Sequence, residues 1–451
     1  MFHLAYVFER FPSFTQTFCV REVLQLERMG VRPLVFSIRD TRDEGIRHFP
    51  KELFDRVHFL PAREQLIEQV RQWKDAHLLP RAAGLVLRHW EERPDKMRVY
   101  EAAYMAKVIA DLGAARPYHA HAHFAGIGAR TCWWLRKFAG LSYSFTAHAN
   151  DIFCKPGEQL PAFDRLFDDA ALVITVSDFT ARQLRDQFPA SAARVHRVYN
   201  GLDLEPIIAA RAKADRSRSA GGILSVGRLI EKKGFDDLIT ACGILRDQGV
   251  TFCCRIVGEG PLEADLKAQI SSLGLNDRVE LTGPLGMDEI IRLLVEETQV
   301  FALACVTEKD GGKDNLPTVL MEAMAASLPC VSTRLAGVPE MVLNGRTGLI
   351  CDERRPAEFA ALIAQLLSDP NLCDEMGTAG LAHAKTEFAR ETTGRQLLEK
   401  MAEFGGLRFD RGLALNGKYL RRLPNLFSRQ LRHRAPKVHG KSFDLDGFMG
   451  R

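Results

Sequence analysis

A single carboxylate lies inside a nearly continuous apolar stretch of the sequence, and a second one precedes it by eight residues. The stretch LPTVLMEAMAASLP spans Leu316–Pro329, and Glu322 is its only charged side chain. Such a run predicts a buried helix, in which a lone carboxylate is costly unless it is paired or hydrogen-bonded. Two explanations for this carboxylate are equally good. Sugar hydroxyls could donate hydrogen bonds to Glu322, or Glu322 could form an ion pair with a cation from the other half of the chain. The second carboxylate, Asp314, precedes the helix. Pro317 near the helix start leaves the first amides able to face a ligand, and Thr318 adds a hydroxyl there.

Two cations follow a predicted strand in the sequence LSVGRLIEKKGFDDL. Arg228 comes directly after the strand, and Lys233 stands just before Gly234 and the helix expected from Phe235. Cations near a strand end and a helix N-terminus suit a diphosphate, because the helix dipole and the free amides add to their charge. Two solvated surface cations would give the same local pattern.

Three histidines alternate in the sequence YHAHAHFAG. His119, His121 and His123 should lie on one face of a strand, and imidazoles are common metal ligands. No matching carboxylate or cysteine stands nearby in the sequence to complete a tetrahedral set. We therefore expect structural or sugar-contacting histidines and no metal site.

A fourth histidine, His148, ends a predicted strand in the sequence FTAHAND. Asn150 or Asp151 could simply cap the next segment. As a functional group, the His148 imidazole would face Arg228 and Lys233 across a cleft.

Short β-branched runs alternate with helical segments along the chain. The strands predicted in the first half are Leu4–Phe8, Arg32–Ile38, His119–Phe124, Ser142–His148, Leu172–Ser177 and Arg194–Asn200. Those predicted in the second half are Ile223–Gly227, Thr251–Gly258, Val279–Gly283, Val300–Cys305, Pro329–Thr333 and Thr347–Cys351. This alternation predicts two doubly wound α/β domains, each with a parallel sheet, and a site in the cleft between them. The long piece Pro61–Leu112, punctuated by Pro80 and Pro94, predicts two helices.

The length and composition set the outer limits. A chain of 451 residues is too long for one ordinary core, and the domain boundary is expected near Leu202–Ser219. The apolar share of 46% is typical of soluble proteins, and a net charge of +4 argues against a dedicated nucleic-acid binder. No apolar run reaches the ~20 residues of a membrane span, and no signal peptide is evident. The ten scattered cysteines contain no CxxC pair and predict reduced, buried thiols in a cytoplasmic protein.

Together these motifs resemble the family-4 retaining glycosyltransferases of the GT-B fold. The resemblance is strongest over Gly221–Leu349, where VGRLIEKKG, IVGEGPLEADL, LTGPLGMDEI, LPTVLMEAMAASLPCVSTRLAGVPEMV and NGRTGLI occur in that order. The sequence NGLD at Asn200–Asp203 and the earlier HAHFAG and SFTAHANDI add to it. The start, FERFPSFTQTFCVREVLQL, is similar to the branch that serves bacterial exopolysaccharide and colanic-acid-type assembly.

The resemblance implies two Rossmann-like domains that face each other across a cleft. Residues 1–203 would form the acceptor-side domain, and residues 204–385 would bind a nucleotide sugar. A helix at 386–405 would return to the first domain, and residues 406–451 would form a basic tail. The implied enzyme is a hexosyltransferase that moves a sugar from a nucleotide-sugar donor to a glycan or lipid-linked acceptor. It would retain the anomeric configuration and require no metal or other cofactor.

The resemblance also assigns roles to residues. The family carries two glutamates, Glu-x7-Glu. The second, which binds the ribose hydroxyls, is Glu322 here, and the first, which meets the donor sugar, is Asp314. Arg228 and Lys233 match the pair that neutralises the diphosphate, and His148 matches the histidine beside the donor sugar. The other donor-binding positions are Leu285, which would touch the base, and Asn315, Leu316, Pro317 and Thr318 at the helix start.

The chain departs from the family pattern in two places. Asp314 is one methylene shorter than the expected glutamate, and Asn315 follows it where the family often has glycine. The loop must then move inward, or the donor sugar must differ. The sequence TQT at Thr15–Thr17 replaces the usual Ser-Glu-Thr, which affects the expected acceptor contacts. The resemblance assigns no protein nucleophile. The leaving diphosphate is expected to help deprotonate the acceptor while cations and helix amides hold its charge.

The last part of the chain is basic. Between Arg411 and Gly440 there are eight Arg or Lys residues and no Asp or Glu, and leucines interleave with them. This pattern predicts either a solvated tail or a peripheral foot on the inner membrane surface, where a lipid-linked acceptor would lie.

Two other classes of function fit parts of the pattern. A nucleotide-sugar epimerase or a phosphorylase can use a similar two-domain architecture, but neither predicts the whole motif order, and no pyridoxal-phosphate lysine is identifiable. A non-catalytic sugar-nucleotide binder would explain the departures at Asp314 and Asn315. Incubation with labelled nucleotide sugars separates transfer, isomerisation and mere binding.

Overall fold

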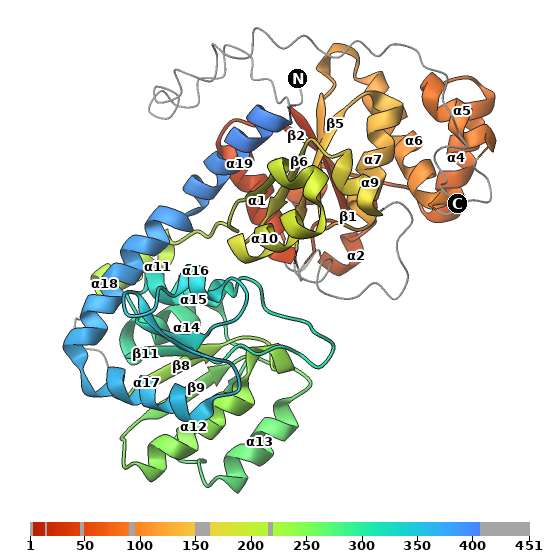
Figure 1. Cartoon of the computed structure of the whole chain (residues 1–451). Helices are drawn as coiled ribbons and strands as arrows, with labels where there is room; N and C mark the ends of the chain where they lie inside the picture. Colours follow the sequence, from red (N-terminus) through yellow and green to blue (C-terminus); the bar gives the residue numbers. More distant parts are fainter. Residues whose placement is uncertain are drawn as a thin grey trace. The chain divides into compact units, whose positions relative to one another are not determined.

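The computed structural model describes residues 3–13, 16–45, 49–89, 95–148, 163–214 and 220–405. Within these ranges the chain forms two parallel β-sheets with helices packed against them (Figure 1). The alternation of strands and helices in the sequence predicted this architecture, and the prediction of two doubly wound α/β domains is confirmed. The basic segment between Arg411 and Gly440 lies outside the described residues, as do Asn150 and Asp151.

The first sheet has seven strands in the order β3-β2-β1-β4-β5-β6-β7. Its strands are β1 (Leu4–Arg10), β2 (Pro33–Arg39), β3 (Val57–Phe59), β4 (His119–His123), β5 (Ser142–Ala147), β6 (Leu172–Thr175) and β7 (Val195–Arg197). The central strands are buried along most of their length because helices cover both faces of a parallel sheet. The sequence missed β3, a three-residue edge strand too short to give a periodic signal.

The helices of this half include three where the sequence predicted two. The segment Pro61–Leu112 contains α4 (Arg63–Asp75), α5 (Arg81–His89) and α6 (Lys96–Asp111), so the prediction of two helices is wrong. Pro80 separates α4 from α5. The other helices are α1 (Thr17–Arg28), α2 (Arg42–Gly45), α3 (Lys51–Phe54), α7 (Ile127–Ala139), α9 (Phe163–Asp168) and α10 (Asp178–Gln187).

The second sheet has six strands in the order β10-β9-β8-β11-β12-β13. They are β8 (Gly222–Val226), β9 (Cys253–Val257), β10 (Val279–Gly283), β11 (Val300–Leu303), β12 (Cys330–Thr333) and β13 (Gly348–Cys351). The helices are α11 (Glu205–Lys213), α12 (Phe235–Asp247), α13 (Glu263–Ser272), α14 (Met287–Arg292), α15 (Thr318–Ala325), α16 (Val338–Met341) and α17 (Pro356–Ser368). All six strands lie where the sequence predicted them, within three residues at each end.

Two long helices close the described part of the chain. Helix α18 (Pro370–Glu387) packs on α15 and α17, whereas α19 (Arg390–Phe404) packs on α1 and β6 of the first sheet (Figure 1). Between them, the backbone N–H of Leu202 donates to Phe388 O, and that of Arg390 donates to Leu202 O, both over 2.9 Å. The α18–α19 connection is therefore fixed to the segment that joins β7 to α11.

The described residues show the state of the cysteine thiols and whether any helix could cross a membrane. Nine cysteines there are free thiols, and eight of them are buried as predicted, whereas Cys253 is exposed. Within the described ranges, none of the helices combines the length and the apolar character needed to cross a bilayer.

Candidate active site

The predicted site residues follow strands at the two points where strand order reverses. In the second sheet β8 neighbours β11. Arg228 and Lys233 come after β8, and Asp314 comes after β11. In the first sheet the reversal lies between β1 and β4, where His123 ends β4 and His148 follows the adjacent β5. Ligands of open α/β sheets bind outside the carboxyl ends of strands at such points.

Glu322 lies on α15, whose other residues are mostly buried in the core of the second domain. Its side chain is partly exposed, and within the described residues it makes neither a hydrogen bond nor an ion pair. Burial raises the pKa of Glu322 from 4.5 to about 7, although the charges of Arg21 and Lys233 pull it down. The ion pair that the sequence left open as an explanation is thus not formed with any described cation. A carboxylate in this state can accept hydrogen bonds from a bound molecule.

Lys233 and Asp314 form an ion pair, with 2.5 Å between Nζ and Oδ2. Burial would lower the pKa of Lys233, but the Asp314 carboxylate raises it above its ordinary value, so the ammonium stays charged. Gly234 makes this approach feasible. It has φ 62°, and a Cβ there would overlap the carbonyl oxygen of Ala304, next to β11. The glycine therefore lets the loop after β8 reach the loop after β11.

The other predicted donor-binding residues are spread around this pair. Arg228 is exposed and has no ion pair with a described residue, which leaves its guanidinium available to an anion. Thr318 is the first residue of α15, and Pro317 precedes it, so the first amides of the helix lack intrahelical partners. Leu316 is packed into the core, and Leu285 is partly buried against it, beyond β10. The predicted contacts of these residues with a nucleotide sugar stay predictions.

The Asn315 side chain is hydrogen-bonded within the protein, and its predicted donor contact stays a prediction. It is only 4% exposed. Its Oδ1 accepts from Ser177 Oγ over 2.7 Å, and its Nδ2 donates to Thr180 Oγ1 over 2.8 Å. Both partners belong to the N-terminus of α10 in the first domain. The side-chain amide of Asn315 thus ties the two domains together.

Glu340, which the sequence did not single out, makes a second tie at the same helix. Its carboxylate accepts from the backbone N–H groups of Asp178 and Phe179, over 2.7 and 2.8 Å, and from Tyr199 Oη over 3.1 Å. Free amides and the positive end of the helix dipole favour a carboxylate at a helix N-terminus. A glutamate inside the four-residue helix α16 gives no local sign of such a long-range role.

His148 is the outer member of a buried chain of polar side chains. It is 8% exposed, and its Nε2 lies 3.1 Å from Nδ1 of His123, whose Nε2 lies 3.0 Å from Glu22 Oε1. Tyr6 Oη also donates to Glu22. Burial lowers the pKa of His123, but the neighbouring Cys19 and Glu22 more than offset it, so that the pKa lies well above its ordinary value. Burial and the charge on His123 keep the pKa of His148 well below it.

The carboxylate that the sequence analysis did not find beside the histidines is therefore Glu22, from α1. Ligand atoms of Glu22, His121 and His123 lie within 4.8 Å of one another, although Glu22 is about 100 positions away in the sequence. The ring nitrogens of His121 lie 2.7 and 3.1 Å from the hydroxyls of Ser144 and Thr146, and those of His123 are used as described above. These contacts favour a hydrogen-bonded network over a metal centre.

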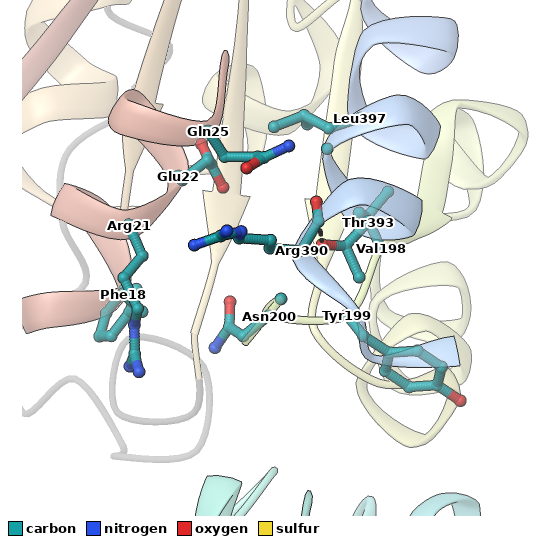
Figure 2. A pocket seen from close by; sticks show the side chains of 12 residues that line it. Phe18, Arg21, Glu22, Gln25, Val198, Tyr199, Asn200, Arg390, Thr393 and Leu397 are labelled. Carbon is teal, nitrogen blue, oxygen red and sulfur yellow. Dashed lines mark hydrogen bonds between the residues drawn. The ribbon is translucent and has the colours of Figure 1, made fainter. Parts of the chain in front are cut away.

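Sequence reasoning also missed Arg21 and Gln25 on the same helix. With Glu22 they lie three and four positions apart, a spacing that puts polar groups on one face of a helix. All three line a small pocket together with the segment after β7 and α19 (Figure 2). The polar face of α1 was visible in the sequence, but the partner elements were not.

Two family models match successive parts of the chain. A "Glycosyltransferase Family 4" model matches residues 15–206, and a "Glycosyl transferases group 1" model matches residues 209–383. The chain is 29% identical to the amylovoran biosynthesis glycosyltransferase AmsK of Erwinia amylovora over 409 residues. The aligned region covers 86% of this chain and 97% of AmsK. It is also 36% identical to the putative colanic acid biosynthesis glycosyltransferase WcaL of Escherichia coli K12 over 213 residues. That aligned region covers 46% of this chain and 51% of WcaL.

Solved glycosyltransferase structures share the fold. Anabaena Alr3699/HepE, solved in complex with UDP, superposes with a TM-score of 0.63 over 89% of this chain and 100% of that one, at 18% identity. At this identity the likeness shows the fold alone.

Proposed function

Because the chain belongs to the GT-B glycosyltransferases, with a family-4 domain followed by a group-1 domain, we propose that it transfers a sugar from a nucleotide sugar to a glycan or lipid-linked acceptor in bacterial surface-polysaccharide synthesis. The observation that carries the proposal is the unpartnered Glu322 carboxylate beside the Lys233–Asp314 pair at the reversal of the second sheet. To bind a nucleotide sugar, a site needs a carboxylate that accepts hydrogen bonds from the ribose hydroxyls and cations that neutralise the diphosphate.

The residues divide the work as follows. Lys233 and Arg228 hold the diphosphate, helped by the first amides of α15. Glu322 accepts from the ribose hydroxyls, Leu285 touches the base, and Asp314 accepts from hydroxyls of the donor sugar once the diphosphate competes with it for Lys233. In its pair with Lys233, Asp314 keeps the ammonium charged and in place before the donor arrives.

The chemistry is transfer with retention at the anomeric carbon. The bond between that carbon and the diphosphate oxygen breaks, and the acceptor oxygen bonds to the same face of the sugar. The acceptor proton passes to the departing diphosphate, which leaves as a nucleoside diphosphate. Fixed cations and helix amides stabilise the charge that develops on the leaving group, which is electrostatic preorganisation. His148 stands beside the donor sugar, and its contact with His123 fixes the orientation of the ring.

Incubation of the full chain with a panel of labelled UDP- and GDP-linked hexoses and a set of alkyl glycosides tests the proposal. Transfer of label to a glycoside, with an anomeric NMR signal of the same configuration as in the donor, is the expected result. Inversion refutes retention. Conversion of the donor into its epimer would make the protein an epimerase, and binding without turnover would make it a sugar-nucleotide binder.

The lipid-linked acceptor and the peripheral membrane contact form the finer part of the proposal. Their support is the basic segment of Arg411–Gly440, with eight cations and no acid. Each cation near an anionic surface is worth about 1 kcal/mol, and 1 M salt shortens the screening length to roughly 3 Å. Flotation with phosphatidylglycerol liposomes should therefore occur for the full chain at low salt only. It should be lost when residues 411–451 are deleted, while transfer to a soluble glycoside persists. Equal flotation of both forms, or none of the full chain at low salt, removes the membrane contact.

A further inference from the structure

The segment between β11 and α15 contacts the first domain on both sides of Asp314. Just before Asp314, the ammonium of Lys313 lies over the ring of Phe179, 5.9 Å from its centroid. Just after it, the Asn315 side chain bonds to two hydroxyls at the start of α10. The Asp314 carboxylate goes the other way, to Lys233 of the second domain. The acid therefore stands between two side chains that contact the opposite domain.

The contacts of Asn315 are the firmer of the two. Its Oδ1 and Nδ2 are both used, by Ser177 and by Thr180, and both bonds are buried. Its backbone oxygen accepts from the N–H of Gly337 over 3.0 Å, and a Cβ on Gly337 would overlap that oxygen. A displaced Asn315 would leave buried polar groups without partners, which native structures avoid. The backbone beside Asp314 thus has one favoured position.

The other end of the segment is fixed within the second domain. The backbone N–H and the hydroxyl of Thr307 donate to the two carboxylate oxygens of Glu353, over 2.5 and 2.9 Å. A turn then reverses the chain, where the N–H of Glu308 donates to Gly312 O over 2.8 Å. The turn ends two residues before Asp314, so the hydrogen bonds of the residue that follows the acid are closer to it along the chain.

A fixed backbone matters more for this acid than for a longer one. Asp314 has one methylene fewer than the expected glutamate, so its carboxylate has less freedom to reach a bound sugar. In the proposed reaction the diphosphate competes for Lys233, and the ion pair then no longer fixes the carboxylate. A misplacement of about 1 Å near the reacting atoms can cost roughly 100-fold in rate. The hydrogen bonds of Asn315 limit such a movement.

We propose that Asn315 is a positioning residue for Asp314, which it holds in place for the donor sugar through its two hydrogen bonds to α10. The inference rests on the proposed transferase function for the role of Asp314 in transfer, but the tie itself is independent of turnover. It deepens that function in one respect. A helix of the first domain, which carries neither Arg228 nor Lys233, sets the geometry of the donor side. A substitution at Thr180 should then act on Asp314 from the opposite domain.

Hydrogen–deuterium exchange of the free full chain tests the tie without any transfer reaction. Thr180→Val keeps the side-chain shape and removes the hydroxyl that accepts from Asn315, whereas Asn315→Ala removes both bonds. Each should speed exchange of the amides in residues 308–316 by about tenfold, because local opening becomes easier. Thr180→Ser keeps the hydroxyl and should restore the slow exchange. The matched control, Thr386→Val, changes an exposed threonine of α18 and should leave exchange unchanged. Wild-type exchange in both Thr180→Val and Asn315→Ala overturns the proposal.

Turnover with the donor that the labelled panel identifies then tests the positioning. Thr180→Val should lower kcat by about tenfold and keep the donor KM within about twofold, because the cations and Glu322 are untouched. In an Asp314→Asn background the same substitution should cost nothing further, since it acts through the carboxylate. Losses that add in the double variant would show a merely structural role and overturn the proposal. A wild-type chain that transfers nothing refutes the transferase function, and the exchange measurement still decides whether Asn315 holds the segment.

Discussion

Replacement of Glu322 by glutamine should make the protein more stable and its donor binding weaker. The carboxylate has a pKa of about 7 in the fold, against 4.5 for an ordinary glutamate. A difference of this size corresponds to roughly 3 kcal/mol, at 1.36 kcal/mol per pH unit. Solvent reaches the partly exposed side chain and reduces the cost, so about 1–3 kcal/mol is expected.

The pH window follows from the direction of the shift. The folded protein binds more protons at Glu322 than the unfolded chain does between pH 4.5 and about 7. The free energy of unfolding therefore falls as the pH rises through this window and stays lower above it. Glutamine has no such loss. Glu322→Gln should unfold at a higher temperature than the wild type at pH 8, by about 2–4 °C per kcal/mol for a domain of this size, and the gain should vanish near pH 4.5.

Donor binding should move the other way. A hydrogen bond to a charged group contributes about 1.5–3 kcal/mol, so the variant should bind UDP, used as the probe, roughly 10- to 150-fold more weakly at pH 8. Wild-type affinity should itself fall as the pH drops below about 7, because protonation removes the acceptor charge, whereas the affinity of the variant should not change there.

Scanning calorimetry and titration calorimetry at pH 5, 6, 7 and 8 measure both effects. The control, Glu375→Gln, changes an exposed acid of α18 and should alter neither. No gain in stability at pH 8 would mean that the Glu322 carboxylate is not destabilised by burial. A gain in stability with unchanged UDP affinity would remove Glu322 from the ribose site.

Three further predictions follow from the ion pair and the domain tie. Arg228→Ala or Lys233→Ala should weaken binding of a nucleoside diphosphate far more than binding of the bare nucleoside, by titration calorimetry; equal losses would place them away from the phosphates. Asp314→Asn should leave diphosphate binding unchanged or make it tighter, because Lys233 loses its competing partner, whereas sugar transfer should fall. Weaker diphosphate binding would contradict the proposal that the diphosphate replaces Asp314 as the partner of Lys233. Glu340→Gln should lower the free energy of unfolding by about 1–2 kcal/mol, since the amides at the start of α10 lose a charged partner, and denaturant unfolding measures it. An unchanged midpoint would show that this tie contributes nothing in solution.

Local patterns were enough for every strand of the two sheets except the short β3, and they singled out the candidate donor residues. β-branched runs followed by glycine mark strand ends, and in a parallel sheet those ends gather at one edge. Residues that follow β8 and β11 were therefore predictable as neighbours, although more than 80 residues separate Arg228 from Asp314. Glu322 was noticeable because a charge in an apolar helix contradicts its surroundings. The three helices between Pro61 and Leu112 were miscounted because two prolines allow several divisions of one helical pattern.

The sequence by itself determined the alternation of elements, the two sheets, the acid in α15 and the cations beside it. Only the tertiary structure decided that Glu22 joins His123, that Asn315 and Glu340 hold α10, and that residues of α1 and α19 line one pocket. The physical reason is distance along the chain. Periodicity and turn chemistry act over a few residues, whereas these contacts join residues from about 100 to more than 350 positions apart and form only when the packed core brings their elements together.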